Sequence, residues 1–324
     1  MTDGVILVIS APGDRHAEAV LAHLQHAHVA AQLVDIGSYP YTMSLTSAID
    51  DKMWSCLLAT SDGTVVRLTD CRVIWCRRPR AYTIDPRIQQ PRHKLFALRE
   101  SSEALMGTLS SLDVLWVNDP FSEWAAEQKI YQLRTARAVG LTIPRTLVTN
   151  EPQRARAFID ELGVHRSVYK CFSATPEDWR ETRIMRSDEL ELLDNVRYAP
   201  VIFQEYVQAG VDLRVTIIGD KTFAAAIHSQ GLGYDVDYRM TLGRAQVEPT
   251  ELPSSVNRRL HALMDRMNLV YGAIDLRRTP DGVYVFLEIN PNGEFLFIEE
   301  FTGQPIAAGV AQFLTACAGE RSRA

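Results

Sequence analysis

Three oxygen-bearing side chains occupy two neighbouring apolar segments near the end of the chain. Asp275 lies within Gly-Ala-Ile-Asp-Leu, and Glu288 lies within Val-Phe-Leu-Glu-Ile, with Asn290 two residues further on. Residues two apart on a strand share a face, and a turn at 280–282 predicts that the two segments pair. A carboxylate inside an apolar strand is costly unless it is paired or bound to a metal. Three hard oxygen ligands without His or Cys therefore favour a Mg²⁺ site over a solvated surface hairpin.

Two lysines lie upstream of this set. Lys129 comes early on a predicted helix, and Lys170 ends the apolar strand Val-Tyr-Lys. A lysine at a strand end can reach over a cleft as a point charge for phosphate oxygens. Either lysine alone is typical of a solvated surface. Together with the three oxygen ligands, they indicate a phosphate site.

A strand that ends before Gly210 carries Gln204, Glu205, Tyr206 and Val207. Such a strand end can offer adenine an apolar slot and a donor–acceptor pair, although the signal is weak by itself. Downstream, Asp212 and Arg214 share one strand face. Arg214 either points at an anionic substrate or forms a plain cross-strand ion pair, and the sequence leaves both open.

Two further groups have an open interpretation. Arg77 and Arg78 follow Trp75, where they either recognise a carboxylate-bearing peptide or pack at a strand end. Asp235 lies with Asp237 and Arg239 in a Gly-flanked loop, where a substrate-facing segment is expected, although a plain excursion fits equally. The histidines at 23, 26 and 28 indicate a solvated helix face. The sequence contains no GxGxxG, GxxxxGK[ST] or GxSxG motif.

The predicted helices and strands that must position these residues follow two patterns along the chain. The first third alternates strands with helices, which predicts an α/β layer with a mostly parallel sheet. From residue 167 the pattern is that of an α+β protein. We expect one helix from Ser122, its N-cap, to Val139, with Gly140 as its stop. We expect a hairpin across Gly219-Asp220. The other expected strands are 5–10, 32–36, 56–60, 65–68, 73–76, 114–117, 168–172, 201–206, 269–276 and 283–289, and the other helices 16–28, 92–112, 152–162, 254–267 and 305–316.

Bulk properties narrow the class of protein. The chain has 324 residues and a net charge of −6, which suits two or three units around a cleft and argues against non-specific nucleic-acid binding. Its five cysteines include no CxxC pair, so buried thiols in a reducing cytoplasm are expected. The start has no basic region before its short apolar run, and no stretch approaches membrane-spanning length. We expect a cytoplasmic protein without membrane contact.

The order of these residues resembles the ATP-grasp superfamily from roughly Asn118 to the C-terminus. Three stretches look closer still to the ligases that modify peptides in microviridin-type pathways, the graspetide macrocyclases. These stretches are Trp75–Pro79, Gly140–Asn150 and Phe286–Phe295. The resemblance implies an ATP-grasp fold with an N-terminal α/β pre-ATP-grasp domain at 1–118. It also implies a central subdomain at 119–200 and a C-terminal subdomain at 201–324.

The resemblance also implies roles for the residues. Lys129 and Lys170 would hold ATP phosphates, the segment 204–207 the adenine and Asp212 the ribose. Asp275, Glu288 and Asn290 would bind Mg²⁺. Arg214 would steady the acyl phosphate or the acceptor carboxylate, and Arg214 and Lys170 would be the catalytic residues. The candidate substrate contacts Arg77, Arg78 and Asp235 come from the residues themselves rather than from the resemblance. One departure stands out, because the stretch 171–186, where many relatives carry a Gly-rich lid, has no Gly but Arg180, Arg183 and Arg186.

The implied activity is ATP-dependent ligation of Asp or Glu side chains in a ribosomal precursor peptide, with leader and core, to Ser, Thr or Lys. The products would be ester or amide macrocycles. The alternatives are a ligase for small molecules or protein tails, of the glutathione synthetase or glutamate-adding type, and a nucleotide-binding regulator without turnover. A homodimer is also implied.

Overall fold

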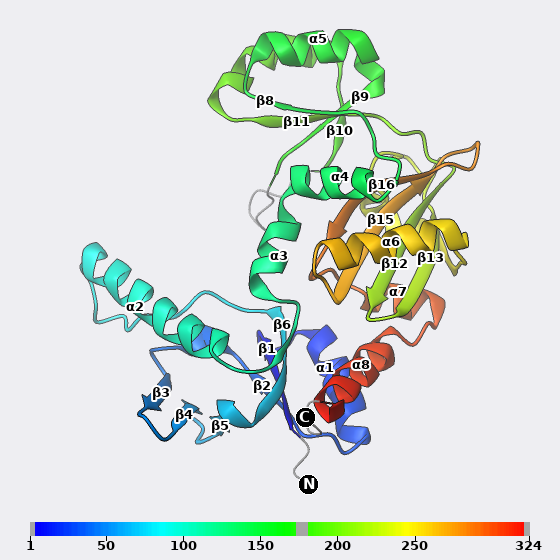
Figure 1. Cartoon of the computed structure of the whole chain (residues 1–324). Helices are drawn as coiled ribbons and strands as arrows, with labels where there is room; N and C mark the ends of the chain where they lie inside the picture. Colours follow the sequence, from blue (N-terminus) through cyan, green and yellow to red (C-terminus); the bar gives the residue numbers. More distant parts are fainter. Residues whose placement is uncertain (1–3, 173–180, 321–324) are drawn as a thin grey trace.

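The computed structural model describes residues 4–172 and 181–320. Its elements form three lobes (Figure 1). The N-terminal lobe lies at the bottom of the view, a small central lobe at the top, and a C-terminal lobe between them on the right.

A parallel sheet forms the centre of the N-terminal lobe. Its order is β2-β1-β6-β7, with β1 Val5–Ser10, β2 Ala31–Val34, β6 Cys71–Arg78 and β7 Leu115–Val117. Along β1, Ile6 and Val8 face one hydrophobic cluster with helix α1 (Arg15–His26), and Leu7 and Ile9 face another with α2 (Pro91–Ser110). Both faces are covered, which explains the nearly continuous apolar run of the strand.

The prediction of a mostly parallel sheet is wrong for part of this lobe. The segments around 56–60 and 65–68 are β4 (Trp54–Thr60) and β5 (Val65–Arg67), and β4 pairs antiparallel with both β5 and β3 (Met43–Ile49). Strand β3 was not among the predicted strands. Its second half is exposed and it carries Ser and Thr at several positions, so the apolar pattern that marks a strand is weak there.

The single helix predicted from Ser122 to Val139 is wrong. The structure has α3 (Pro120–Glu127) and α4 (Lys129–Ala138), separated at Gln128, whose backbone is extended. Asp119, not Ser122, is the N-cap, and its carboxylate accepts from the Ser122 N–H at 2.9 Å. Pro120 at the first helical position fits that cap. Lys129 is consequently the first residue of its own helix.

The central lobe is an antiparallel sheet of order β10-β9-β11-β8. The strands are β8 Thr146–Thr149, β9 Ser167–Lys170, β10 Arg183–Ile184 and β11 Val201–Glu205. Helix α5 (Pro152–Leu162) and the 3₁₀ segment η4 (Ser187–Tyr198) pack on it through Ile159, Leu193 and Phe203.

The C-terminal lobe is an antiparallel sheet of order β14-β13-β12-β15-β16. Its strands are β12 Val211–Ile218, β13 Lys221–His228, β14 Gln246–Pro249, β15 Tyr271–Arg278 and β16 Tyr284–Asn290. The predicted hairpin across Gly219-Asp220 and the turn at 280–282 are confirmed. Helix α6 (Ser254–Arg266) covers one face, and α7 (Leu296–Thr302) and α8 (Ile306–Glu320) lie at the other.

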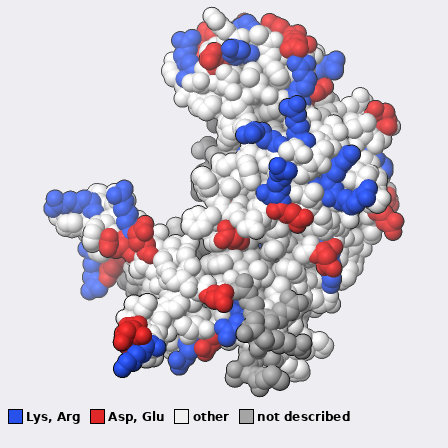
Figure 2. Space-filling view, in the orientation of Figure 1, with Lys and Arg blue, Asp and Glu red and all other residues white. Residues whose placement is uncertain are grey.

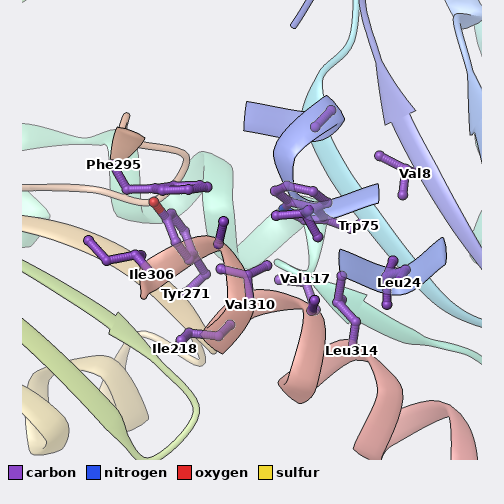
Figure 3. Packing of buried hydrophobic residues seen from close by; sticks show 14 of the residues in the cluster. Val8, Leu24, Trp75, Val117, Ile218, Tyr271, Phe295, Ile306, Val310 and Leu314 are labelled. Carbon is purple, nitrogen blue, oxygen red and sulfur yellow. The ribbon is translucent and has the colours of Figure 1, made fainter. Parts of the chain in front are cut away.

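Helix α8 joins the N-terminal and C-terminal lobes. Its Val310 and Leu314 belong to one hydrophobic cluster that includes Leu24 of α1, Trp75 of β6 and Ile218 of β12. Figure 3 shows these side chains meeting around α8. The two sheets therefore share one continuous core rather than a wet interface.

The packing groups some segments differently from the predicted domain boundaries, which stay a prediction. Helices α3 and α4 contribute Ala126, Leu133 and Ala136 to the core of the C-terminal lobe. Strand β11, placed in the C-terminal subdomain by the sequence, pairs with β8 and β9 of the central sheet.

Three smaller expectations have mixed outcomes. Cys56 and Cys71 are buried as expected, but Cys171 is exposed. The three histidines near the end of α1 are exposed, in agreement with a solvated face. In the described part of the chain, no helix combines the length and the apolar character that crossing a bilayer requires.

Candidate functional site

The three predicted oxygen ligands meet on the C-terminal sheet. Asp275 on β15 lies opposite Glu288 on β16, next to a register shift in the pairing. The Asn290 amide nitrogen lies 3.5 Å from an Asp275 oxygen and 3.4 Å from a Glu288 oxygen. Within residues 4–172 and 181–320, no group of three His, Cys, Asp or Glu side chains is arranged to hold a metal. The candidate set is therefore two carboxylates and one amide.

The two lysines lie beside this set. Lys129 Nζ is 2.8 Å from Glu288 Oε2. Burial alone would raise the pKa of Glu288, but Lys129 and Lys170 outweigh it and lower that pKa to about 2. Burial lowers the pKa of Lys170, and Glu288 opposes the shift. Glu288 is accordingly held as a carboxylate between two cationic side chains.

The pKa of Asp275 is shifted in the opposite direction, upward. Burial raises its pKa, the attraction of Arg214 lowers it, and the neighbouring Glu288 raises it further. Two carboxylates side by side in a buried position repel each other unless a cation lies near both. The charge pattern consequently suits a divalent cation bound by Asp275 and Glu288.

Arg214 forms the cross-strand ion pair that the sequence left open. One of its terminal nitrogens lies 3.0 and 3.1 Å from the two Asp275 oxygens, and the other donates to the Glu294 carbonyl oxygen at 2.9 Å. Its side chain is buried, and its Nε has no partner within the described residues. A contact with an acyl phosphate stays a prediction.

Two cavities meet at the oxygen ligands. The smaller, about 280 Å³, is lined by Lys129, Lys170, Asp212 and Glu288 among others. The larger, about 930 Å³, is lined by Arg78, Arg214 and the segment 289–294 among others. Both are lined by Lys129, Phe172, Tyr238, Arg239, Asp275 and Asn290. Figure 2 shows basic side chains gathered where the central lobe meets the lobe that carries α6.

Tyr238 and Arg239 were not among the predicted site residues. The Tyr238 hydroxyl donates to Asp275 Oδ1 at 3.1 Å, and Arg239 pairs with Asp237, so the 229–245 loop folds back over the oxygen ligands. The sequence signal was the Gly-flanked loop itself. It marked the region but did not select these two side chains. Asp235, the residue selected instead, accepts from the Gly231 N–H at 2.8 Å within the loop.

The predicted adenine segment lines a different cavity. Glu205, Tyr206 and Val207 border a hollow of about 700 Å³ that also includes Pro144 and Asp281. The Gln204 side chain is buried and donates to Thr146. The adenine role of this segment stays a prediction.

Asp212 is buried and already paired. Its Oδ1 accepts from Arg277 Nε at 2.8 Å and its Oδ2 from the Ser229 hydroxyl at 2.7 Å. It still lines the smaller cavity. A carboxylate has more lone pairs than these two bonds use, so a ribose contact stays a prediction.

Arg77 and Arg78 have different surroundings near the oxygen ligands. Arg77 is 2% exposed and donates to the Asn292 carbonyl oxygen at 2.7 Å, so it positions the loop that follows Asn290. Arg78 lines the larger cavity and pairs with Glu294. The packing alternative therefore describes Arg77, whereas Arg78 is placed to meet a ligand. Substrate contact stays a prediction for both.

Two of the three arginines in the stretch 171–186, Arg183 and Arg186, lie within the described residues. Arg180 lies outside the described residues. Arg183 pairs with Glu181, and Arg186 pairs with Asp188. Both side chains therefore have a carboxylate partner close by in the sequence.

A separate cavity of about 670 Å³ lies in the N-terminal lobe. It opens at the carboxyl ends of β1 and β6, where Ile9 and Cys76 line it, and α2 and α3 form its walls. Glu127 lines both this cavity and the larger of the two beside the oxygen ligands.

The α/β lobe followed by two sheets, with lysines and paired carboxylates between them, defines an ATP-dependent ligase architecture. Residues 126–314 match the family model described as the RimK-like ATP-grasp domain, and residues 5–123 match the MvdD pre-ATP-grasp domain. The chain belongs to the RimK-like ATP-grasp family and is an ATP-grasp ligase. The predicted fold and enzyme class are thus confirmed.

Solved structures of peptide-modifying enzymes match nearly the whole chain. The macrocyclase MdnC from Microcystis aeruginosa MRC, bound with precursor peptide MdnA, is 29% identical, with 96% of this chain and 99% of that chain covered and a TM-score of 0.85. A RiPP-associated ATP-grasp ligase of Chryseobacterium gregarium, in complex with ADP and a leader and core peptide, is 28% identical, with 97% of each chain covered and a TM-score of 0.87. A probable alpha-L-glutamate ligase of Saccharophagus degradans is 23% identical over 66% of this chain and 71% of its own length.

Proposed function

We propose that this protein uses Mg-ATP to activate Asp or Glu side chains of a ribosomal precursor peptide and joins them to Ser, Thr or Lys as ester or amide macrocycles. The observation that carries the proposal is the shared border of two cavities. Asp275 and Asn290 line both, so a nucleotide in one cavity and a peptide carboxylate in the other would meet at the oxygen ligands. The similar macrocyclase and RiPP-associated ligase support the peptide as the partner.

The donor set fits Mg²⁺. Two carboxylates and one amide oxygen are hard ligands, and rotation of the Asn290 amide group presents its oxygen to the ion. Asp275, Glu288 and Asn290 would hold the ion. When bound, Mg²⁺ neutralises charge that develops on the phosphate oxygens.

The residues of the chain would contribute charge and position. Lys129 and Lys170 would hold the phosphates of ATP in the smaller cavity, and Arg78 and Arg239 would orient the peptide carboxylate in the larger. A carboxylate oxygen attacks the γ-phosphorus and ADP leaves. The hydroxyl or amine then attacks the acyl carbon, phosphate leaves, and the nucleophile loses its proton. The peptide loses one water in mass per ring. Positioning and charge neutralisation are the main contributions required of the protein.

The glutamate-adding alternative keeps some support from the probable alpha-L-glutamate ligase. That relative covers 66% of this chain, whereas the peptide-modifying structures cover 96–97%.

Intact-mass spectrometry tests the proposal. A precursor peptide encoded beside this gene would be incubated with the enzyme, ATP and Mg²⁺. Losses of about 18 Da per ring, the mass of one water, are expected from acyl-phosphate chemistry. Unchanged peptide mass, with ADP released when free amino acids are supplied, would instead support the glutamate-adding activity. ATP binding without ADP release under any acceptor would support a regulator.

The predicted homodimer and cytoplasmic location are also proposals. Light scattering coupled to size-exclusion chromatography would test the homodimer.

A further inference from the structure

Arg277 connects segments that the predicted roles treat separately. It lies on β15 two residues after Asp275, so both side chains share a face of the sheet. Its side chain is buried, and its Nε donates to Asp212 Oδ1 at 2.8 Å. Arg277 is not among the residues proposed to contact ATP or the peptide.

The rest of the guanidinium reaches two other segments. One terminal nitrogen donates to the Val207 carbonyl oxygen at 2.8 Å, and the other donates to the carbonyl oxygens of Asp235 and Val236 at 3.2 and 3.1 Å. The group also lies 5.8 Å from the centre of the Tyr206 ring. One side chain thus joins the 206–207 segment, β12 and the 229–245 loop.

The loop continues directly into the shared wall of the two cavities. Tyr238, two residues after the anchored Val236, donates to Asp275, and Arg239 follows it. A second bond holds the start of the loop, because the Ser229 hydroxyl donates to Asp212. Hydrogen bonds from Arg277 therefore link Val207 and Asp212 to the backbone that presents Tyr238 and Arg239.

We propose that Arg277 is a positioning residue that couples nucleotide binding in the smaller cavity to the geometry of the 229–245 loop, whose Tyr238 and Arg239 line both cavities. Lysine cannot replace it, because an ammonium group is a point donor without the planar fork that spans three directions. The inference rests on ATP-grasp family membership. It also deepens the proposed function, since it assigns a device that readies the peptide side of the site.

Hydrogen exchange of the loop amides, measured without peptide, tests the coupling. In the unmodified protein, Mg-ADP is expected to slow exchange in residues 229–245 by roughly fivefold or more, within the usual range of coupling between sites. In Arg277→Lys the slowing is expected to disappear while Mg-ADP still binds. Arg278→Lys is the matched control, because its side chain lies on the opposite face of the same strand, and it should retain the slowing.

A second variant guards against misfolding of the first. Ser229→Ala removes the loop bond to Asp212 but keeps Arg277, and it should reduce the slowing only in part. Equal slowing in Arg277→Lys and the unmodified protein, or no slowing in the unmodified protein, would overturn the inference. Because no peptide is used, unmodified precursor in the mass assay would reject the proposed function without affecting this result.

Discussion

At the scale of single residues, Glu288 has the most sharply defined charge. Lys129 and Lys170 hold its pKa at about 2, so it remains ionised throughout the useful pH range. Glu288→Gln removes that charge while keeping the size of the side chain. We expect ADP formation to fall at least roughly 100-fold, since weaker outer-sphere changes already cost 10–100-fold at metal sites. Glu300→Gln changes an exposed side chain of helix α7 and should leave the rate unchanged in the same ADP-release assay.

Arg239 allows a second test at this scale. It lines both cavities, so a charge that develops during phosphoryl transfer would meet it from either side. Arg239→Ala should lower kcat by roughly 100-fold, as loss of one charge-stabilising donor does elsewhere, with a small change in the KM for ATP. The exposed neighbour Met240 gives the control Met240→Ala. An unchanged kcat in Arg239→Ala would exclude a role in the chemical step.

The residues that the sequence identified and those that it missed differ in one physical respect. Asp275, Glu288 and Asn290 lie on two strands joined by a short turn, so strand periodicity was enough to bring them together. Tyr238 reaches Asp275, and Arg239 reaches both cavities, through the fold of an irregular loop, which has no period. The partner of Asp212 was missed for a related reason, because the register of β12 against β15 brings Arg277 there.

At the scale of elements, hydrophobic periodicity predicted strands and helices better than it predicted their ends. It found both hairpins of the C-terminal sheet. It joined α3 to α4 because Gln128 is neither a glycine nor a proline, the residues that usually mark the end of a helix. The break matters for the site, since it makes Lys129 the first residue of α4, where its ammonium reaches Glu288.

Helix α3 also carries an unusual carboxyl group. Burial raises the pKa of Glu123 from 4.5 to about 7, although the Asn292 amide donates to it at 3.1 Å. Because its pKa is higher in the folded state, Glu123 binds its proton more tightly there than in the unfolded chain. The stability gained from this protonation is complete below pH 4.5 and is lost as the pH rises through 7. Glu123→Gln keeps an acceptor without the charge. It should therefore raise the free energy of unfolding at pH 8 by up to about 3 kcal/mol, with the gain vanishing near pH 4.5.

Urea denaturation at a series of pH values measures this effect. Glu127→Gln is the control, because Glu127 lies one turn further along α3 and is exposed. Its difference from the unmodified protein should stay near zero at every pH. A gain in Glu123→Gln that does not depend on pH would show that the charge of Glu123 is not its source.

At the scale of the whole molecule, the hydrophobic clusters predict which lobes unfold together. Leu314 of α8 is fully buried in the cluster that spans the N-terminal and C-terminal sheets, whereas Leu193 is buried in a cluster confined to the central lobe. Sequence periodicity identified α8 as a helix but gave no sign that it bridges two sheets, because that role depends on contacts with Leu24 and Ile218 far away in the chain.

Two matched truncations test this organisation. Leu314→Ala should cost about 2–5 kcal/mol, and hydrogen exchange should accelerate in β6 and β12 together, because both strands lose the same support. Leu193→Ala removes the same atoms from the other cluster, and its faster exchange should stay within β8–β11, as expected for separate cooperative units. If Leu314→Ala accelerated exchange in β12 alone, the two larger lobes would be independent units, and the cavities beside Asp275 would lie on the C-terminal unit without a fixed N-terminal wall.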